Sequence, residues 1–146
     1  GGYHPEASKI VSQMRKKRME TVFISDDGVK DDTFIKVAKE YAEGVYATGP
    51  KDVSSNPMAI AANEAHKKAY GADPGAFFLN AYAAALALLN AVEQAGSTDY
   101  DAVAKALQTK DVATPLGNIH FDERGDATGV GFSMYQVKNG VYVELK

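Results

Sequence analysis

The stretch TVFISDDGVKDD, residues 21–32, decides the fold, because a short β-branched and aromatic run is followed at once by an acidic loop that contains glycine. Buried strands of α/β proteins end in loops of this kind. Helical spacing of apolar residues, with Asp31 or Asp32 able to cap the first turn, predicts a helix that ends at Gly44. GVYATG at 44–49 is the next strand. The pattern predicts a strand–helix–strand unit with parallel strands.

Regular elements are also predicted on both sides of this unit. An amphipathic helix is expected at 5–18, with its basic run in the last turns, where cations complement the helix dipole. The chain begins with GGYHPE, a glycine turn with no strand before it. Asn56 and Pro57 predict the start of a helix that ends at Gly71.

The remaining elements are predicted from changes in period. The expected elements are an apolar helix at 76–95, a short helix from Thr98 to Leu107, a strand near 119–121 and a C-terminal β-hairpin around Asn139-Gly140. The 76–95 helix is apolar nearly all round, so burial on several sides is expected. Its apolar run is short for a membrane span and contains two asparagines, which favours a buried core helix.

Composition limits the class of protein. The 146 residues suggest about one domain, and a hydrophobic share of 45% with a charged share of 24% is ordinary for a soluble globular chain. The net charge of -3 provides no basic excess for a nucleic-acid partner. Cysteine is absent, so disulfides and thiolate catalysis are excluded.

Four carboxylates gather in residues 26–32, called the acidic loop below: Asp26, Asp27, Asp31 and Asp32. The loop follows a strand, and ligands of open α/β sheets bind outside the carboxyl ends of strands. Three interpretations remain open from the residues alone. The acids shape the turn and cap the helix; or they form the metal and phosphoacceptor pocket of a free-standing receiver-like or flavodoxin-like regulatory domain; or one carboxylate pairs with the cation of a ligand.

No pattern in the chain indicates catalysis. The three histidines lack metal-ligand spacing, the serines lie in no nucleophile-elbow context, and the glycines form no phosphate-binding loop. We expect no enzyme, no cofactor and no bound metal.

Several motifs together resemble those of one protein family. In order and spacing, the chain is similar to the C-terminal portion of periplasmic leucine/isoleucine/valine-binding proteins, the type I solute-binding proteins of ABC transporters. The resemblance covers essentially the whole chain. The motifs are GGYHPEA, SDDGV, AEGVYATGP, NAYAAALALLNAVEQAG and GNIHFDERGD.

The resemblance implies an α/β fold of the periplasmic-binding-protein type I class, in which parallel sheets are flanked by helices in two lobes with the ligand in the cleft between them. The fold would be incomplete here and would end in the β-hairpin. Residues 1–49 would be a second-lobe segment, 50–126 a mainly helical first-lobe segment, and 127–146 the return to the second lobe.

Two positions match the family's ligand contacts. Tyr3 corresponds to an aromatic residue that lines the cleft beside the ligand side chain, and Asp27 to the carboxylate that takes the ligand's α-ammonium group. Many leucine-binding relatives have glutamate there, so an aspartate shortens the reach by one methylene and leaves open a larger or γ-amino acid as ligand. The groups that hold the ligand carboxylate would belong to the missing N-terminal half.

The expected role is that of the ligand-binding component of an ABC transporter for branched-chain or related aliphatic amino acids. The partners would be a small amino-acid ligand and, for the intact protein, the membrane permease; the location would be the periplasm, with the signal peptide outside these residues. Exposed strand edges and apolar residues near 86–89 lead us to expect either the missing N-terminal half or a second copy in an element-swapped dimer. The chain alone should bind free amino acids very weakly.

Overall fold

The computed structural model describes residues 2–145 and divides into two compact units. The first unit consists of residues 2–52 and 131–145, and the second of Val53–Val130. The chain therefore leaves the first unit once and returns to it once. These boundaries lie three and four residues beyond the predicted ones at 49 and 126. The assignment of the segments to two lobes stays a prediction.

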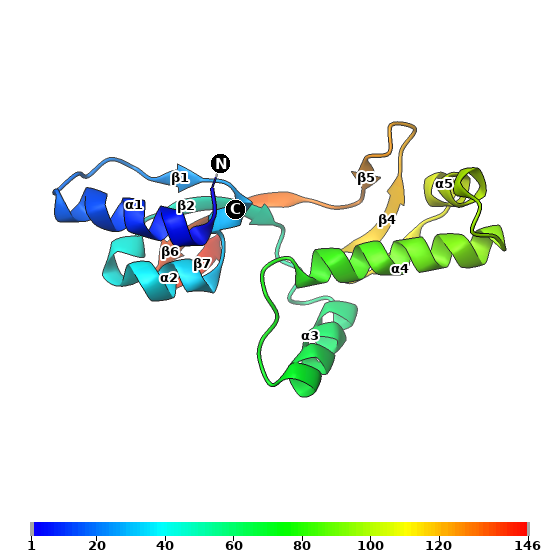
Figure 1. Cartoon of the computed structure of the whole chain (residues 1–146), viewed down its shortest axis with the longest axis horizontal. Coiled ribbons are helices and arrows are strands. Elements are labelled where there is room, and N and C mark those ends of the chain that lie inside the picture. The colour runs from blue at the N-terminus through cyan, green and yellow to red at the C-terminus, as the bar shows by residue number, and fades with distance from the viewer. Residues whose placement is uncertain (1, 146) are drawn as a thin grey trace. The chain divides into compact units, whose positions relative to one another are not determined.

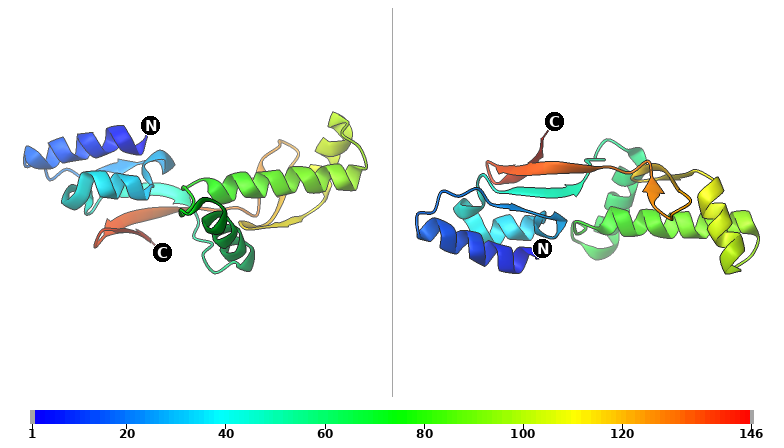
Figure 2. Two further views of the ribbon diagram at one scale, coloured as in Figure 1. Left: turned by 60° about the horizontal axis from the view of Figure 1, so that its bottom comes forward. Right: turned by 90° about the horizontal axis from the view of Figure 1, so that it is seen from above.

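The first unit is a four-stranded sheet with helices on one face (Figures 1 and 2). Its elements are α1 (His4–Lys16), β1 (Ile24–Ser25), the 3-10 helix η1 (Asp27–Val29), α2 (Asp32–Ala38), the 3-10 helix η2 (Lys39–Ala42), β2 (Tyr46–Pro50), β6 (Phe132–Lys138) and β7 (Val141–Glu144).

The sheet order is β1-β2-β6-β7. Strands β1 and β2 are parallel, with Ile24 opposite Tyr46, and this confirms the predicted parallel strand–helix–strand unit. Strands β6 and β7 continue the sheet in antiparallel fashion, so it is mixed. The predicted hairpin turn is present, with positive φ at both Asn139 and Gly140. The helix expected to reach Gly44 was predicted too long, because Lys39 takes a φ of 53° and the chain continues as η2.

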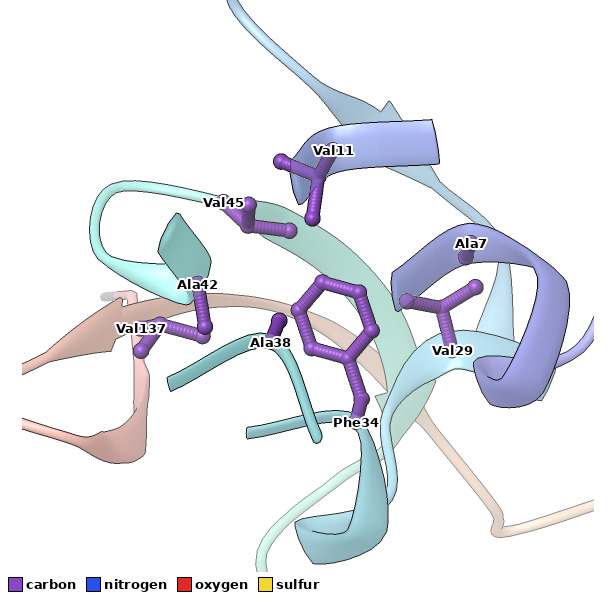
Figure 3. Close-up of a cluster of buried hydrophobic side chains, with 8 residues drawn as sticks. All are labelled: Ala7, Val11, Val29, Phe34, Ala38, Ala42, Val45 and Val137. Atoms are coloured by element: carbon purple, nitrogen blue, oxygen red, sulfur yellow. The ribbon is translucent and has the colours of Figure 1, made fainter. Parts of the chain in front are cut away.

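The core of the first unit lies between the sheet and its helices (Figure 3). Phe34 is fully buried at its centre, and Val11 of α1 and Val137 of β6 are also fully buried. The full set is Ala7, Val11, Val29, Phe34, Ala38, Ala42, Val45 and Val137. Because Val29 belongs to the acidic loop, the loop is anchored in this core.

The second unit contains three helices and a three-stranded antiparallel sheet in the order β3-β4-β5. Its elements are α3 (Pro57–Tyr70), α4 (Phe78–Ala95), α5 (Tyr100–Thr109), β3 (Val112–Thr114), β4 (Gly117–Phe121) and β5 (Ala127–Thr128). Helix α3 has the predicted cap, because the side chain of Asn56 accepts a hydrogen bond from the Met58 amide at 2.9 Å. The cap of α5 was predicted one residue too early: Asp99, not Thr98, accepts from the Ala102 amide.

Helix α4 buries one face rather than several. Ala83, Ala87 and Ala91 are buried, and α4 packs against α5 and β3. Leu88 and Leu89 remain 52% and 67% exposed. The expectation of burial on several sides is therefore wrong for the part of the chain that the structure describes. Within residues 2–145, no helix has both the length and the hydropathy needed to cross a membrane.

Candidate functional site

The acidic loop leaves the carboxyl end of β1 and folds back on itself. The amides of Val29 and Lys30 donate to the carbonyl oxygens of Asp26 and Asp27 at 3.3 and 3.1 Å, and the Asp31 amide donates to the Val29 carbonyl at 2.8 Å. Since these bonds satisfy the backbone within the loop, the carboxylates can project from a fixed frame.

Asp31 is the N-cap of α2. Its carboxylate accepts from the Thr33 amide at 2.7 Å, as one interpretation of the acidic loop predicts. Burial acts to raise the pKa of this carboxyl, but the hydrogen bonds from the Thr33 hydroxyl and amide and the charges of His4 and Lys36 outweigh it, and the pKa lies below its ordinary value of 3.8. Asp31 is thus committed to holding the helix start.

Asp27 opens the 3-10 helix and is half-buried. Among residues 2–145, no hydrogen bond or ion pair involves its carboxylate, so it can accept a partner from outside. Gly28 is buried directly beside Tyr3: a β-carbon placed on Gly28 would lie 2.5 Å from the Gly2 carbonyl oxygen and 3.1 Å from Cδ1 of Tyr3. The structure therefore brings the Tyr3 ring, which is 66% exposed, to the residue that follows Asp27.

Two tyrosines of the C-terminal hairpin hold the loop from the sheet side. The Tyr142 hydroxyl donates to the Val29 carbonyl at 2.6 Å. The Lys30 ammonium lies 4.3 Å from the centroid of the Tyr135 ring. The Tyr135 hydroxyl donates to the Pro50 carbonyl. The sequence interpretation missed these contacts, because they join residues 85 to 113 positions apart and no local pattern signals them.

Burial widens the pH range over which both tyrosine hydroxyls stay protonated and can donate. Desolvation, followed by the negative charges of Asp31 and Asp32, raises the pKa of Tyr142 far above its ordinary value. Desolvation, with Glu144 and Asp52 as further causes, raises the pKa of Tyr135 to about 12.

The acids of the loop do not converge on a metal. Residues 2–145 contain no group of three histidine, aspartate or glutamate side chains arranged to hold an ion. Asp31 is engaged at the helix start, and Asp27 precedes Gly28, the residue against which Tyr3 lies. This geometry speaks against the receiver-like alternative, whose chemistry needs several carboxylates around one cation.

Comparison with known proteins agrees with this geometry. A family model described as "Periplasmic binding protein" matches residues 20–141. The chain is 35% identical over 148 residues to the leucine-, isoleucine-, valine-, threonine- and alanine-binding protein of Pseudomonas aeruginosa, and 36% identical over 141 residues to a Leu/Ile/Val-binding protein homolog of Brucella suis. These alignments cover 100% and 96% of the chain but only 39% and 38% of the relatives.

Solved structures with the same fold include a leucine binding protein from Thermotoga maritima, with a TM-score of 0.84 and 31% identity. They also include a branched-chain amino acid transporter substrate binding protein from Streptococcus pneumoniae, solved in complex with isoleucine, with a TM-score of 0.78 and 25% identity. Each match covers 99% of this chain and 42% or 43% of the other. The α/β fold of type I periplasmic binding proteins, predicted from the sequence, is thereby confirmed.

Proposed function

The chain belongs to the periplasmic binding protein family, and from this premise we propose that it is a ligand-binding part of an ABC transporter receptor for branched-chain or related aliphatic amino acids. The carrying observation is the carboxylate of Asp27, which follows the carboxyl end of a parallel strand, has no partner among residues 2–145, and precedes Gly28, the residue against which Tyr3 lies. The names of the relatives support this ligand class.

The chemistry of an α-amino acid fits these two groups. An ammonium group taken out of water needs a charged partner that accepts hydrogen bonds, because an unpaired buried charge is very costly. At about 4 Å and an effective dielectric constant near 20, the attraction between Asp27 and an ammonium group is about 4 kcal/mol. The exposed face of Tyr3 offers apolar contact to an aliphatic side chain.

The remaining ligand contacts would come from polypeptide outside residues 1–146. The chain spans about two fifths of the length of the relatives it matches. A receptor that closes around its ligand between two lobes works because contacts to both lobes lower the free energy of the closed form. With the Asp27 side alone, this gain is lost, so we expect the chain by itself to bind leucine or isoleucine very weakly.

We further propose that the polypeptide making up the rest of the family fold covers the apolar surface formed by Leu88 and Leu89 on α4. Leucine pairs exposed to this degree are unfavourable in water. Light scattering of the purified chain tests this, with open-ended aggregation rather than a defined oligomer expected in the absence of that polypeptide. A monodisperse monomer would contradict the proposal, and a stable dimer would point to a second copy instead. The intact receptor would act in the periplasm and deliver its ligand to a membrane permease.

The binding test uses a chimera in which residues 1–146 replace the aligned part of the Pseudomonas aeruginosa relative. Calorimetry with leucine, isoleucine, valine, alanine and γ-aminobutyrate identifies the ligand. Asp27→Asn should weaken binding at least about thirtyfold, since truncating one partner of a buried charge pair costs about 2–5 kcal/mol. Asp32→Asn, which removes the same charge from an exposed position of the same loop, is the control. Equal affinities for the two variants would refute the proposed role of Asp27.

A further inference from the structure

The C-terminal hairpin contacts the acidic loop at two consecutive residues. Tyr142 of β7 donates to the Val29 carbonyl, and Tyr135 of β6 lies beneath the Lys30 ammonium. Val29 and Lys30 are the two residues after Gly28, so they lie two and three positions from Asp27. The site is thus supported by a part of the chain that is remote in sequence.

Hairpin register places the two tyrosines on the same side of the sheet. Val137 is opposite Tyr142 in the β6–β7 ladder, and Tyr135 precedes Val137 by two residues, so all three side chains emerge on one face. Val137 is part of the core of the first unit and Tyr142 packs against that core, so this is the face that α1 and α2 cover. The tyrosines are therefore placed by the sheet, on the side where the helices pack.

The contact at Val29 is sensitive to the loss of one atom. Its carbonyl oxygen accepts from two donors, the Asp31 amide at 2.8 Å and the Tyr142 hydroxyl at 2.6 Å. Val29 is fully buried, so water cannot replace a lost donor without rearrangement. The Tyr142 hydroxyl therefore contributes to the position of the turn that carries Asp27.

The contact between Lys30 and Tyr135 depends on the absence of a side chain at Gly49. A β-carbon on Gly49 would collide with Cδ of Lys30 and lie 3.4 Å from the Tyr135 ring. The lysine stem thus crosses β2 at a residue without a side chain and brings its ammonium to the aromatic face. The cation–π contact thus holds the ammonium at the Tyr135 ring.

We propose that Tyr142 and Tyr135 are positioning residues for ligand binding: by holding Val29 and Lys30, the hairpin fixes the carboxylate of Asp27 where the ligand ammonium must meet it. The expected effect on ligand affinity rests on the proposed function. The expected effect on the position of the acidic loop does not depend on any ligand.

The first arm of the experiment measures amide hydrogen exchange in the chain without ligand. Tyr142→Phe should raise exchange at the Asp31 amide about fivefold, the factor expected for loss of one net hydrogen bond. The Val137 amide, which bonds to the Val45 carbonyl in the sheet, should be unchanged. Tyr100→Phe, at a tyrosine that is 82% exposed, is the matched control and should change neither.

Lysine variants separate the cation from the stem. Lys30→Met keeps the stem and removes the charge, so loop exchange should rise about two- to fivefold, the range of an exposed cation–π contact. Lys30→Arg restores a cation over the ring and should return exchange to the original rate. A purely structural role of the lysine stem would make Lys30→Met silent and would overturn this half of the proposal.

The second arm measures ligand affinity in the chimera. Tyr142→Phe should weaken leucine binding about fivefold, whereas the exposed control Tyr100→Phe should leave leucine binding unchanged. Unchanged exchange at Asp31 in Tyr142→Phe overturns the inference whatever the affinities are. The inference is also overturned if Tyr142→Phe raises exchange at the Asp31 amide but leaves the leucine affinity unaltered, while Asp27→Asn still loses binding. If Asp27→Asn itself has no effect, the proposed function fails, and the exchange result alone decides whether the hairpin holds the loop.

Discussion

Gly28 is where a single added carbon should disturb the site most. In Gly28→Ala the new β-carbon would meet the backbone oxygen of Gly2 at 2.5 Å, whereas ordinary contact begins at 3.4 Å. The oxygen or the loop must therefore move by about 0.9 Å. Because a backbone carbonyl cannot rotate away as a flexible side chain can, the shift must be shared by α1, which begins at His4, and by the acidic loop.

The cost should be about 1–3 kcal/mol of unfolding free energy, the usual range for forcing extra atoms into a packed region. Gly75→Ala is the matched control, since nothing lies within 4 Å of its added carbon. The control should be neutral or slightly stabilising, because replacing glycine reduces the entropy of the unfolded chain. Urea denaturation of both variants provides the difference.

A structural readout accompanies the stability measurement. Nuclear Overhauser contacts between the Tyr3 ring and the α-protons of Gly28 should be strong in the original chain, and those between the ring and the α-proton at position 28 should be weakened in Gly28→Ala. If Gly28→Ala is as stable as Gly75→Ala and keeps these contacts, the close approach of Tyr3 to the acidic loop is refuted.

Three other predictions concern stability, each measured by urea denaturation. Asn56→Ala should lower the unfolding free energy by about 2–3 kcal/mol, because it removes the α3 cap and two hydrogen bonds to the β3–β4 turn. Asn56→Ser keeps a capping oxygen and should recover about 1 kcal/mol of this loss. Equal losses in the two variants would contradict a separate contribution of the cap. Phe34→Ala should cost about 3–5 kcal/mol, whereas Val37→Ala, on the exposed face of the same helix, should cost far less; similar costs would contradict the core assignment. The unfolding free energy should decrease as the pH is lowered below 3.8 and Asp31 gains its proton, because the pKa of Asp31 is lower in the folded chain than its ordinary value. Asp31→Asn should show a smaller decrease over the same pH range. Identical pH profiles would contradict the capping role of the Asp31 carboxylate.

Local signals in the sequence were sufficient for most helix ends and for the hairpin. Asn56-Pro57 and Asn139-Gly140 specify a cap and a turn by their own backbone preferences, and both occur where predicted. Strands β3 and β5 were not predicted, because three- and two-residue strands carry too little alternation to show a period.

Burial and site support depend on contacts between distant residues, and these were less predictable. The apolar composition of α4 could not tell which face the rest of the unit covers, so burial on several sides was expected for this helix, although exposure near 86–89 was expected for the chain alone. Tyr3 and Asp27 were singled out from the family resemblance, and their ligand contacts stay a prediction. The hydrogen bond from Tyr142 to Val29 joins the acidic loop to β7, which lies at the edge of the sheet opposite β1, and no local pattern signals it.

The most direct test of the account is a thermodynamic cycle between the ligand amine and Asp27, measured by calorimetry in the chimera. Leucine and 4-methylpentanoate, which lacks only the amine, are titrated into the original protein and into Asp27→Asn. If the carboxylate meets the ammonium, removing either group costs nearly as much affinity as removing both, so the two losses are strongly non-additive. Additive losses would contradict the account, because the amine and Asp27 would then act independently.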